Sequence, residues 1–178
     1  MIGWVSVACM SLAVLAMTSV AQSVPLTWAP PVLENPITLY PGASGSSSYW
    51  LDNSRDYIVR LPNTLKTGGL TLQNGRNIVI IGGHITIFPN QQWDNRGIYI
   101  KNTVGTVHIE GVLIDGSGGA DSDGIVVNAP EAIVQIQNCR IVGLTGRVDG
   151  LHADIVQPWG GVKELRIDHL TGSTNYQG

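Results

Sequence analysis

Short runs of alternating apolar and polar residues recur along the chain from Leu70 onward, with a spacing of about 27 residues. The first run of each unit lies 28, 27 and 26 residues after the one before, in the segments Leu70–Leu72, Ile98–Ile100, Ile125–Val127 and Leu151–Ala153. A second run follows in the segments Val79–Ile81, Val107–Ile109, Val134–Ile136 and Leu165–Ile167. Period-two alternation predicts β-strands. Val112 with Ile114 and Cys139 with Ile141 indicate a third strand in each unit.

Residues that tolerate a left-handed backbone recur at one point of each unit. They stand two residues beyond the second strand and are Gly83, Gly111, Asn138 and His169. Glycines also precede the first strand, at Gly97, Gly124 and Gly150. A bend at the same point of every unit converts a row of strands into a coil with corners.

Three short strands in each unit predict an all-β fold, a right-handed parallel β-helix of about four coils preceded by an irregular N-terminal coil. A leucine-rich repeat would show helical periodicity between its strands, and none is present. A β-sandwich would need hairpin turns and would have no fixed period. Other β-solenoids are the open alternative.

Alternation divides each predicted strand into residues that face the core and residues that face outward. The outward rows of the first strand are Thr71, Tyr99, Val126 and His152, and Gln73, Lys101, Asn128 and Asp154. An outward row of the second strand is Ile80, His108, Gln135 and Arg166, in which we expect His108 to be solvated.

The chain divides into three segments. Residues 1–21 are almost wholly apolar or small and predict a signal peptide that is cleaved after Ala21, although the first basic residue is Arg55. Residues 22–48 hold five prolines and a serine–glycine run and predict a linker or arm without regular structure. Residues 49–178 are the β-helix, which we expect to be incomplete because the chain stops just after the fourth coil's second strand.

Composition narrows the expected partners and compartment. A net charge of −3 with no basic stripe argues against nucleic acid. The signal peptide predicts a secreted, cell-surface or periplasmic protein with no membrane segment after its removal. Cys139 is then the single cysteine of the mature chain, so no internal disulfide is expected. The sequence leaves the oligomeric state open.

Acidic turns lie beside the first predicted sheet. Asp123 and Asp149 each stand directly before a glycine, and Asp154 follows His152 on the next strand. Carboxylates in adjacent coils can share a cation or divide acid and base roles. The alternative is that aspartates before glycine form turns by bonding nearby backbone amides.

The repeat, including the segment Ile136–Ile141, resembles the pectin-lyase-like superfamily of right-handed β-helices. Residues 121–125, Asp-Ser-Asp-Gly-Ile, are similar to the Asn-Thr-Asp-Gly-Ile strand of polygalacturonases, whereas that family's following Asp-Asp and Gly-His-Gly are absent. The resemblance to pectate lyases implies a calcium ion held by aspartates, with His152, Lys101 or Arg147 as base.

These features lead to two hypotheses. The first is an exported carbohydrate-active protein, a polysaccharide lyase or a glycoside hydrolase, that acts on or binds an acidic polysaccharide along the first sheet. Its predicted catalytic residues are His152, Asp154 and Asp149, its substrate-binding residues Lys101, Asn128, Trp159, Tyr99 and Arg147, and its calcium ligands Asp123, Asp149 and Asp154. The second is a non-catalytic surface or adhesion scaffold.

Overall fold

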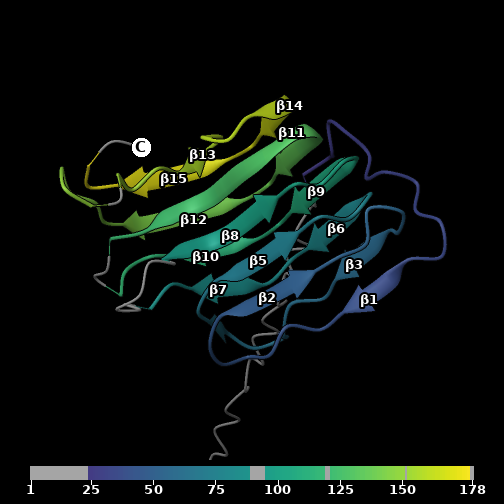
Figure 1. The fold of residues 1–178 in the computed structure, drawn as a ribbon. Coiled ribbons are helices and arrows are strands. Elements are labelled where there is room, and N and C mark those ends of the chain that lie inside the picture. The colour runs from purple at the N-terminus through teal and green to yellow at the C-terminus, as the bar shows by residue number, and fades with distance from the viewer. Residues whose placement is uncertain (1–23, 89–94, 119–120, 151, 177–178) are drawn as a thin grey trace, which may run out of the picture.

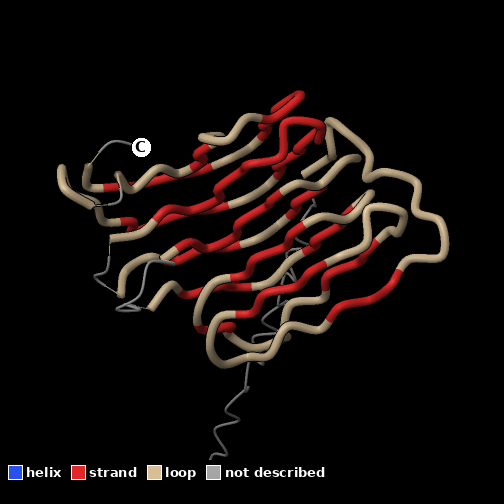
Figure 2. Tube along the Cα trace, in the orientation of Figure 1, coloured by secondary structure: helices blue, strands red, loops and turns tan. Residues whose placement is uncertain are grey.

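The structure, a computed structural model, describes residues 24–88, 95–118, 121–150 and 152–176 and is all-β over these ranges (Figures 1 and 2). Its strands stack in parallel to form a β-solenoid of about four turns, which confirms the predicted fold class. The right-handed sense of the winding stays a prediction. The predicted signal peptide lies outside the described residues, among which no helix is long and apolar enough to cross a membrane.

Three parallel sheets run the length of the solenoid. Sheet A contains β1 (Ile37–Leu39), β3 (Tyr57–Val59), β6 (Ile78–Ile81), β9 (Thr106–Glu110), the second part of β11 (Asp123–Gln137) and β14 (Val162–Asp168). Sheet B contains β2 (Ser47–Trp50), β5 (Leu70–Gln73), β8 (Arg96–Lys101), the first part of β11 and β13 (Val156–Gln157). Sheet C contains β4 (Lys66–Thr67), β7 (His84–Thr86), β10 (Leu113–Asp115), β12 (Arg140–Leu144) and β15 (Thr171–Thr174).

The core is a set of apolar columns, each made by one position in successive coils. In sheet B, Leu70, Ile98 and Ile125 pair in register and are buried, as the alternation predicted. Sheet C aligns Ile85, Ile114 and Ile141 in the same way. Each coil therefore covers the apolar side chains of the coil before it, and burial of this kind is the main force that holds a solenoid together.

Lys66 occupies a core column at the start of sheet C, where it pairs with Ile85 and is buried. Its ammonium group donates to the carbonyl oxygens of Gly45 at 2.6 Å and Gly42 at 3.3 Å. Burial lowers the pKa of Lys66. Lys66, the first inward-facing residue of sheet C, is thus bound to the turn at residues 42–45 by hydrogen bonds instead of apolar contacts.

The predicted register of the second strand is wrong for β6. Ile78 and Ile80 face the core and are fully buried, and Val79 is the residue that pairs with His108. Ile78–Ile81 are all apolar, so alternation could not distinguish the two faces of this strand. The corner that matches Gly111, with the same φ of 65°, accordingly lies at Gly82, and the predicted corner residue Gly83 also has a positive φ, of 110°.

Part of the segment predicted to lack regular structure belongs to the solenoid. Strand β1 pairs with β3, and strand β2, which begins at Ser47, pairs with β5. The expectation for residues 22–48 is therefore wrong for these strands. They complete a first coil that begins before Tyr57.

The fourth coil is also displaced from its predicted position. Val156 and Gln157 stack on Ile125 and Val126, 31 residues later, whereas the sequence predicted that residues 151–153 would do so. Leu151 lies outside the described residues, and Ala153 is a buried turn residue with a φ of 60°. The extra residues of this coil thus precede its first strand, and His152 and Asp154 do not lie on it.

An N-terminal arm, which we define as residues 24–34, crosses the coils on the outer face of sheet A. In Figure 1 it is the purple segment that starts near β11 and β9 and descends on the right to β1. Thr27 and Trp28 bond Gln137 near the last coil, and Glu34 bonds Asp56 in the first. The expectation that His108 is solvated is wrong, because His108 on this face is fully buried.

Candidate functional site

The outer face of sheet B presents a row of large polar and aromatic side chains. Trp50, Gln73, Lys101 and Asn128 pair in register on four successive coils, one residue from each. Trp50 is 76% exposed, and the other three are partly exposed. Neighbouring coils lie roughly 4.8 Å apart, so the row spans roughly 14 Å from Trp50 to Asn128.

Trp159 lies in the loop next to the Asn128 end of this row and is 60% exposed. It follows Gln157, the last residue of β13, and precedes Gly160, whose backbone packs so closely against the Asn128 side chain that a Cβ would not fit. The amide of Gly160 donates to the Val127 carbonyl at 3.4 Å. The loop at residues 158–161 therefore packs against the Asn128 end of the row, and it carries a second exposed tryptophan.

A second outward column runs beside this row and contains Thr71, Tyr99, Val126 and Gln157. Tyr99 is partly exposed, and the Arg96 guanidinium lies 4.9 Å from the centre of its ring. Contact with an aromatic face holds a guanidinium in place without neutralising it. Val126 in the same column is buried.

Charged residues form a column at the beginning of the sheet B strands. Asp123 pairs with Arg96 in the coil before it, and the Asp154 amide donates to Asp123 Oδ1 at 3.1 Å in the coil after it. Asp154 Oδ2 accepts a hydrogen bond of 2.6 Å from Gln157 Nε2. The structure thus brings two of the predicted aspartates together and adds Arg96 and Gln157, which the sequence did not indicate.

Asp123 has an unusual environment for a carboxylate. Its side chain is fully buried, and its Oδ2 is a buried atom without a hydrogen-bond partner. Burial raises the pKa of Asp123; the hydrogen bond from the Asp154 amide and the Arg96 charge oppose this rise, and the Asp154 charge adds to it. A carboxyl group with this balance favours its neutral form more than an exposed aspartate does.

The remaining predicted catalytic residues lie elsewhere in the fourth coil. Asp149 is exposed and faces Arg147, whose Nε lies 3.3 Å from Asp149 Oδ1 and 2.6 Å from Asp121 Oδ2. Arg147 therefore closes a turn as an ion-pair partner instead of extending along the sheet B face. His152 is exposed, and its ring lies 6.3 Å from that of Tyr176.

The predicted calcium site is not assembled. Within the described ranges, no three histidine, cysteine, aspartate or glutamate side chains lie close enough together to hold a metal ion. Asp123 is buried and Asp149 faces Arg147 in the turn, so the two carboxylates do not gather with Asp154 around one point. Calcium takes six to eight oxygen ligands, and the aspartates of this site do not fit it.

Comparison of the chain with protein-family models, with curated proteins and with solved structures finds no match.

The sequence pattern missed one end of the row. Trp50 belongs to it because Ser47–Trp50 is a strand in register with Leu70–Gln73. The signal was present in the chain, since Ser47 and Tyr49 alternate with Ser48 and Trp50 as a half-buried strand does. The preceding serine and glycine residues concealed it.

Proposed function

We propose that the chain is a carbohydrate-binding β-solenoid of the pectin-lyase-like kind, which binds an extended acidic polysaccharide across the coils of sheet B. The observation that carries this proposal is the row of Trp50, Gln73, Lys101 and Asn128, with Trp159 beyond it. An extended polymer that lies along the solenoid axis meets one side chain of the row in each coil.

The chemistry of the row suits a sugar chain with negative charges. A tryptophan presents a flat apolar face on which a pyranose ring packs, and the exposed Trp50 and Trp159 provide one at each end. Gln73 and Asn128 offer amide donors and acceptors for hydroxyl groups. Lys101 supplies a cation in the middle of the row, within reach of a uronate carboxylate.

The aspartates of the charged column are poorly placed for bond cleavage, which favours binding over catalysis. Asp123 is buried with one oxygen bonded to a backbone amide, and Asp154 accepts from Gln157. A general acid or base must reach the proton that it transfers. Lyase and hydrolase activity are therefore outcomes of the test, as is a scaffold that binds no sugar. The proposal includes export of the protein, because such polymers occur outside the cell.

The test is affinity electrophoresis in gels that contain polygalacturonate. The unchanged chain is expected to be retarded, and Trp50→Ala and Trp159→Ala to lose retardation at least fivefold. Both tryptophans are exposed, so these changes leave the core intact. The control is Tyr40→Ala, which removes a 74% exposed aromatic residue that lies outside the row.

Three outcomes separate the alternatives. Unsaturated uronate products identify a lyase, and new reducing ends without unsaturation identify a hydrolase. Retardation without either product supports a binding module. Retardation that both tryptophan variants keep, or no retardation of the unchanged chain, contradicts the proposal.

A further inference from the structure

The outer face of sheet A is covered, although its side chains are polar. His108, Gln135 and Gln137 point away from the core, yet all three are buried. Burying polar groups costs free energy unless each of them finds a partner. Some of their hydrogen-bond partners belong to the N-terminal arm, and the others are neighbouring side chains of the same face.

Gln137 recognises the backbone of the arm. Its Oε1 accepts from the amides of Thr27 at 2.8 Å and Trp28 at 3.0 Å, and its Nε2 donates to the Trp28 carbonyl at 2.8 Å. The hydroxyl of Thr27 also donates to Asp168 in the following coil. One side-chain amide thus satisfies three backbone groups of the arm at the bend formed by Thr27 and Trp28, and these three bonds require no particular side chain.

Gln135 repeats this contact one residue further along the arm. With its amide nitrogen facing the arm, Nε2 lies 3.2 Å from the Ala29 carbonyl and 3.0 Å from His108 Nδ1, while Oε1 accepts from Arg166 at 3.0 Å. His108 then carries its proton on Nε2, which lies 3.2 Å from Glu110. Every polar group of this chain of contacts has a partner.

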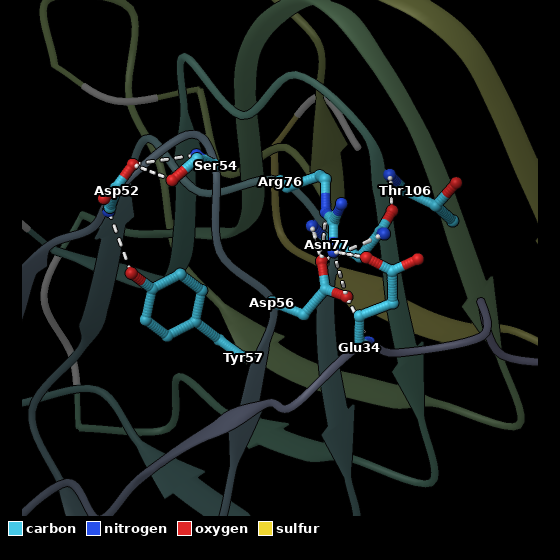
Figure 3. Close-up of polar contacts among 8 residues, drawn as sticks. All are labelled: Glu34, Asp52, Ser54, Asp56, Tyr57, Arg76, Asn77 and Thr106. Carbon is cyan, nitrogen blue, oxygen red and sulfur yellow. Dashed lines mark hydrogen bonds and ion pairs between the residues drawn. The ribbon is translucent and has the colours of Figure 1, made fainter.

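The other end of the arm is held by a buried carboxylate (Figure 3). Asp56 Oδ2 accepts from the Glu34 amide at 2.6 Å, and Arg76 bonds both Asp56 oxygens at 2.7 and 2.9 Å. Arg76 also reaches the Glu34 carboxylate at 2.9 Å. Hydrogen bonds from Arg76 hold the pKa of Asp56 at about 2. Asn77 adds a bond of 3.1 Å to Asp56.

We propose that the outer face of sheet A is a peptide-binding surface that recognises backbone groups, and that residues 24–34 are its built-in occupant. Six of the contacts are made to backbone groups of the arm, at Val24, Thr27, Trp28, Ala29 and Glu34. The occupant is suited to this role, because Pro25, Pro30 and Pro31 favour an extended backbone and reduce the entropy lost on docking. This surface is separate from the sheet B row.

The test asks whether the surface binds the same peptide when it is supplied from outside. Attachment to the chain gives the arm an effective concentration in the millimolar range, so the unchanged chain is expected to bind a labelled peptide of residues 24–34 weakly. Trp28→Pro removes an amide from the arm of the full chain and leaves the surface untouched. Peptide affinity, measured by fluorescence anisotropy, is expected to rise at least tenfold in this variant.

Changing the surface in the same background must abolish that gain. Trp28→Pro combined with Gln137→Leu is expected to lose the added affinity, because a leucine side chain offers no hydrogen bonds to the peptide backbone. The matched control combines Trp28→Pro with Asn63→Leu, which removes an exposed side-chain amide outside both the arm's surface and the sheet B row, and it should bind as Trp28→Pro does. No gain in Trp28→Pro, or a gain that survives Gln137→Leu, overturns the proposal.

Hydrogen exchange of the full chain provides an independent measurement. The amides of Thr27, Trp28 and Glu34 are expected to be protected in the unchanged chain, and Gln137→Leu to raise exchange at Thr27 and Trp28 at least tenfold. Amides of the core strand β8 should not change, which would show that the solenoid stays folded. Exchange of Thr27 and Trp28 at unstructured rates in the unchanged chain would overturn the proposal.

Discussion

Strand β11 contributes to two faces of the molecule that treat their polar side chains in opposite ways. Its first part carries Asn128 on the outer face of sheet B, where the side chain is partly exposed. Its second part carries Gln135 and Gln137 on the outer face of sheet A, where both are buried under the arm. While the arm is docked, the polar groups of the sheet A face are paired within the chain and another ligand must displace the arm, whereas the sheet B face keeps its donors and acceptors available.

The largest expected effect on the free energy of unfolding is at Asp56, which holds the Glu34 end of the arm on the covered face. Asp56→Ala removes a buried carboxylate and leaves Arg76, Asn77 and the Glu34 amide without their common partner. Losing the hydrogen bonds to this buried carboxylate costs about 3 kcal/mol of unfolding free energy, measured by urea denaturation, while the partly exposed Arg76 keeps its contact with Glu34. The control is Asp52→Ala, an exposed aspartate that bonds Ser54. Equal losses of unfolding free energy in the two variants would contradict the expectation that the Asp56 contact with the arm stabilises the fold more than the exposed Asp52 contact does.

The middle of the covered face should be the next most sensitive. His108→Leu leaves Gln135 and Glu110 without their shared partner under the arm, at a cost of about 1–3 kcal/mol. Thr71→Val is its counterpart on sheet B and should change the unfolding free energy by less than about 0.5 kcal/mol. Similar values for both changes would remove the difference between the faces.

The two buried aspartates should respond to pH in opposite directions. Asp56 has a pKa lowered to about 2, so its stabilising contribution is present above the ordinary aspartate pKa and is lost as pH falls toward 2. Asp123 has a raised pKa, so the folded state holds its proton more tightly than the unfolded state does. Stability therefore falls as pH rises from the ordinary aspartate pKa through the raised pKa of Asp123. Asp123→Asn should therefore be more stable than the unchanged chain at pH 7, and Asp56→Asn less stable.

Urea titrations at a series of pH values check this pair. The advantage of Asp123→Asn should shrink as pH falls toward the ordinary aspartate range, and the deficit of Asp56→Asn should shrink as pH falls toward 2. Parallel pH profiles for the two variants would show that their environments do not differ as described.

The smallest expected effect concerns charge on the open face. Lys101→Gln should weaken binding to polygalacturonate two- to fivefold, because an exposed ion pair contributes up to about 1 kcal/mol. The loss should disappear at high salt, which screens exposed charges. Arg55→Gln removes an exposed cation outside the row and serves as the control. An equal effect of both variants would indicate that net charge, and not the row, attracts the polymer.

The sequence determined the solenoid and the register of its central coils. Apolar residues at Ile98, Ile100, Ile125 and Val127 alternate with outward residues, and a period-two pattern with one buried face specifies a single register. Tyr99, Lys101 and Asn128 could therefore be placed on one face before the structure was known. The pattern failed at Ile78–Ile81, where no polar residue distinguishes the two faces.

Only the tertiary structure decided the positions of the fourth coil and the arm. Residues 151–153 imitate a strand in sequence, but pairing with β11 selected Val156 and Gln157, and local alternation contains no information about which of two apolar runs stacks on a neighbour. The proline-rich arm has no periodicity that a pattern could detect. Its place on sheet A depends on side-chain amides more than a hundred residues away, such as Gln137, and long-range contacts of this kind exist only once the coils have stacked.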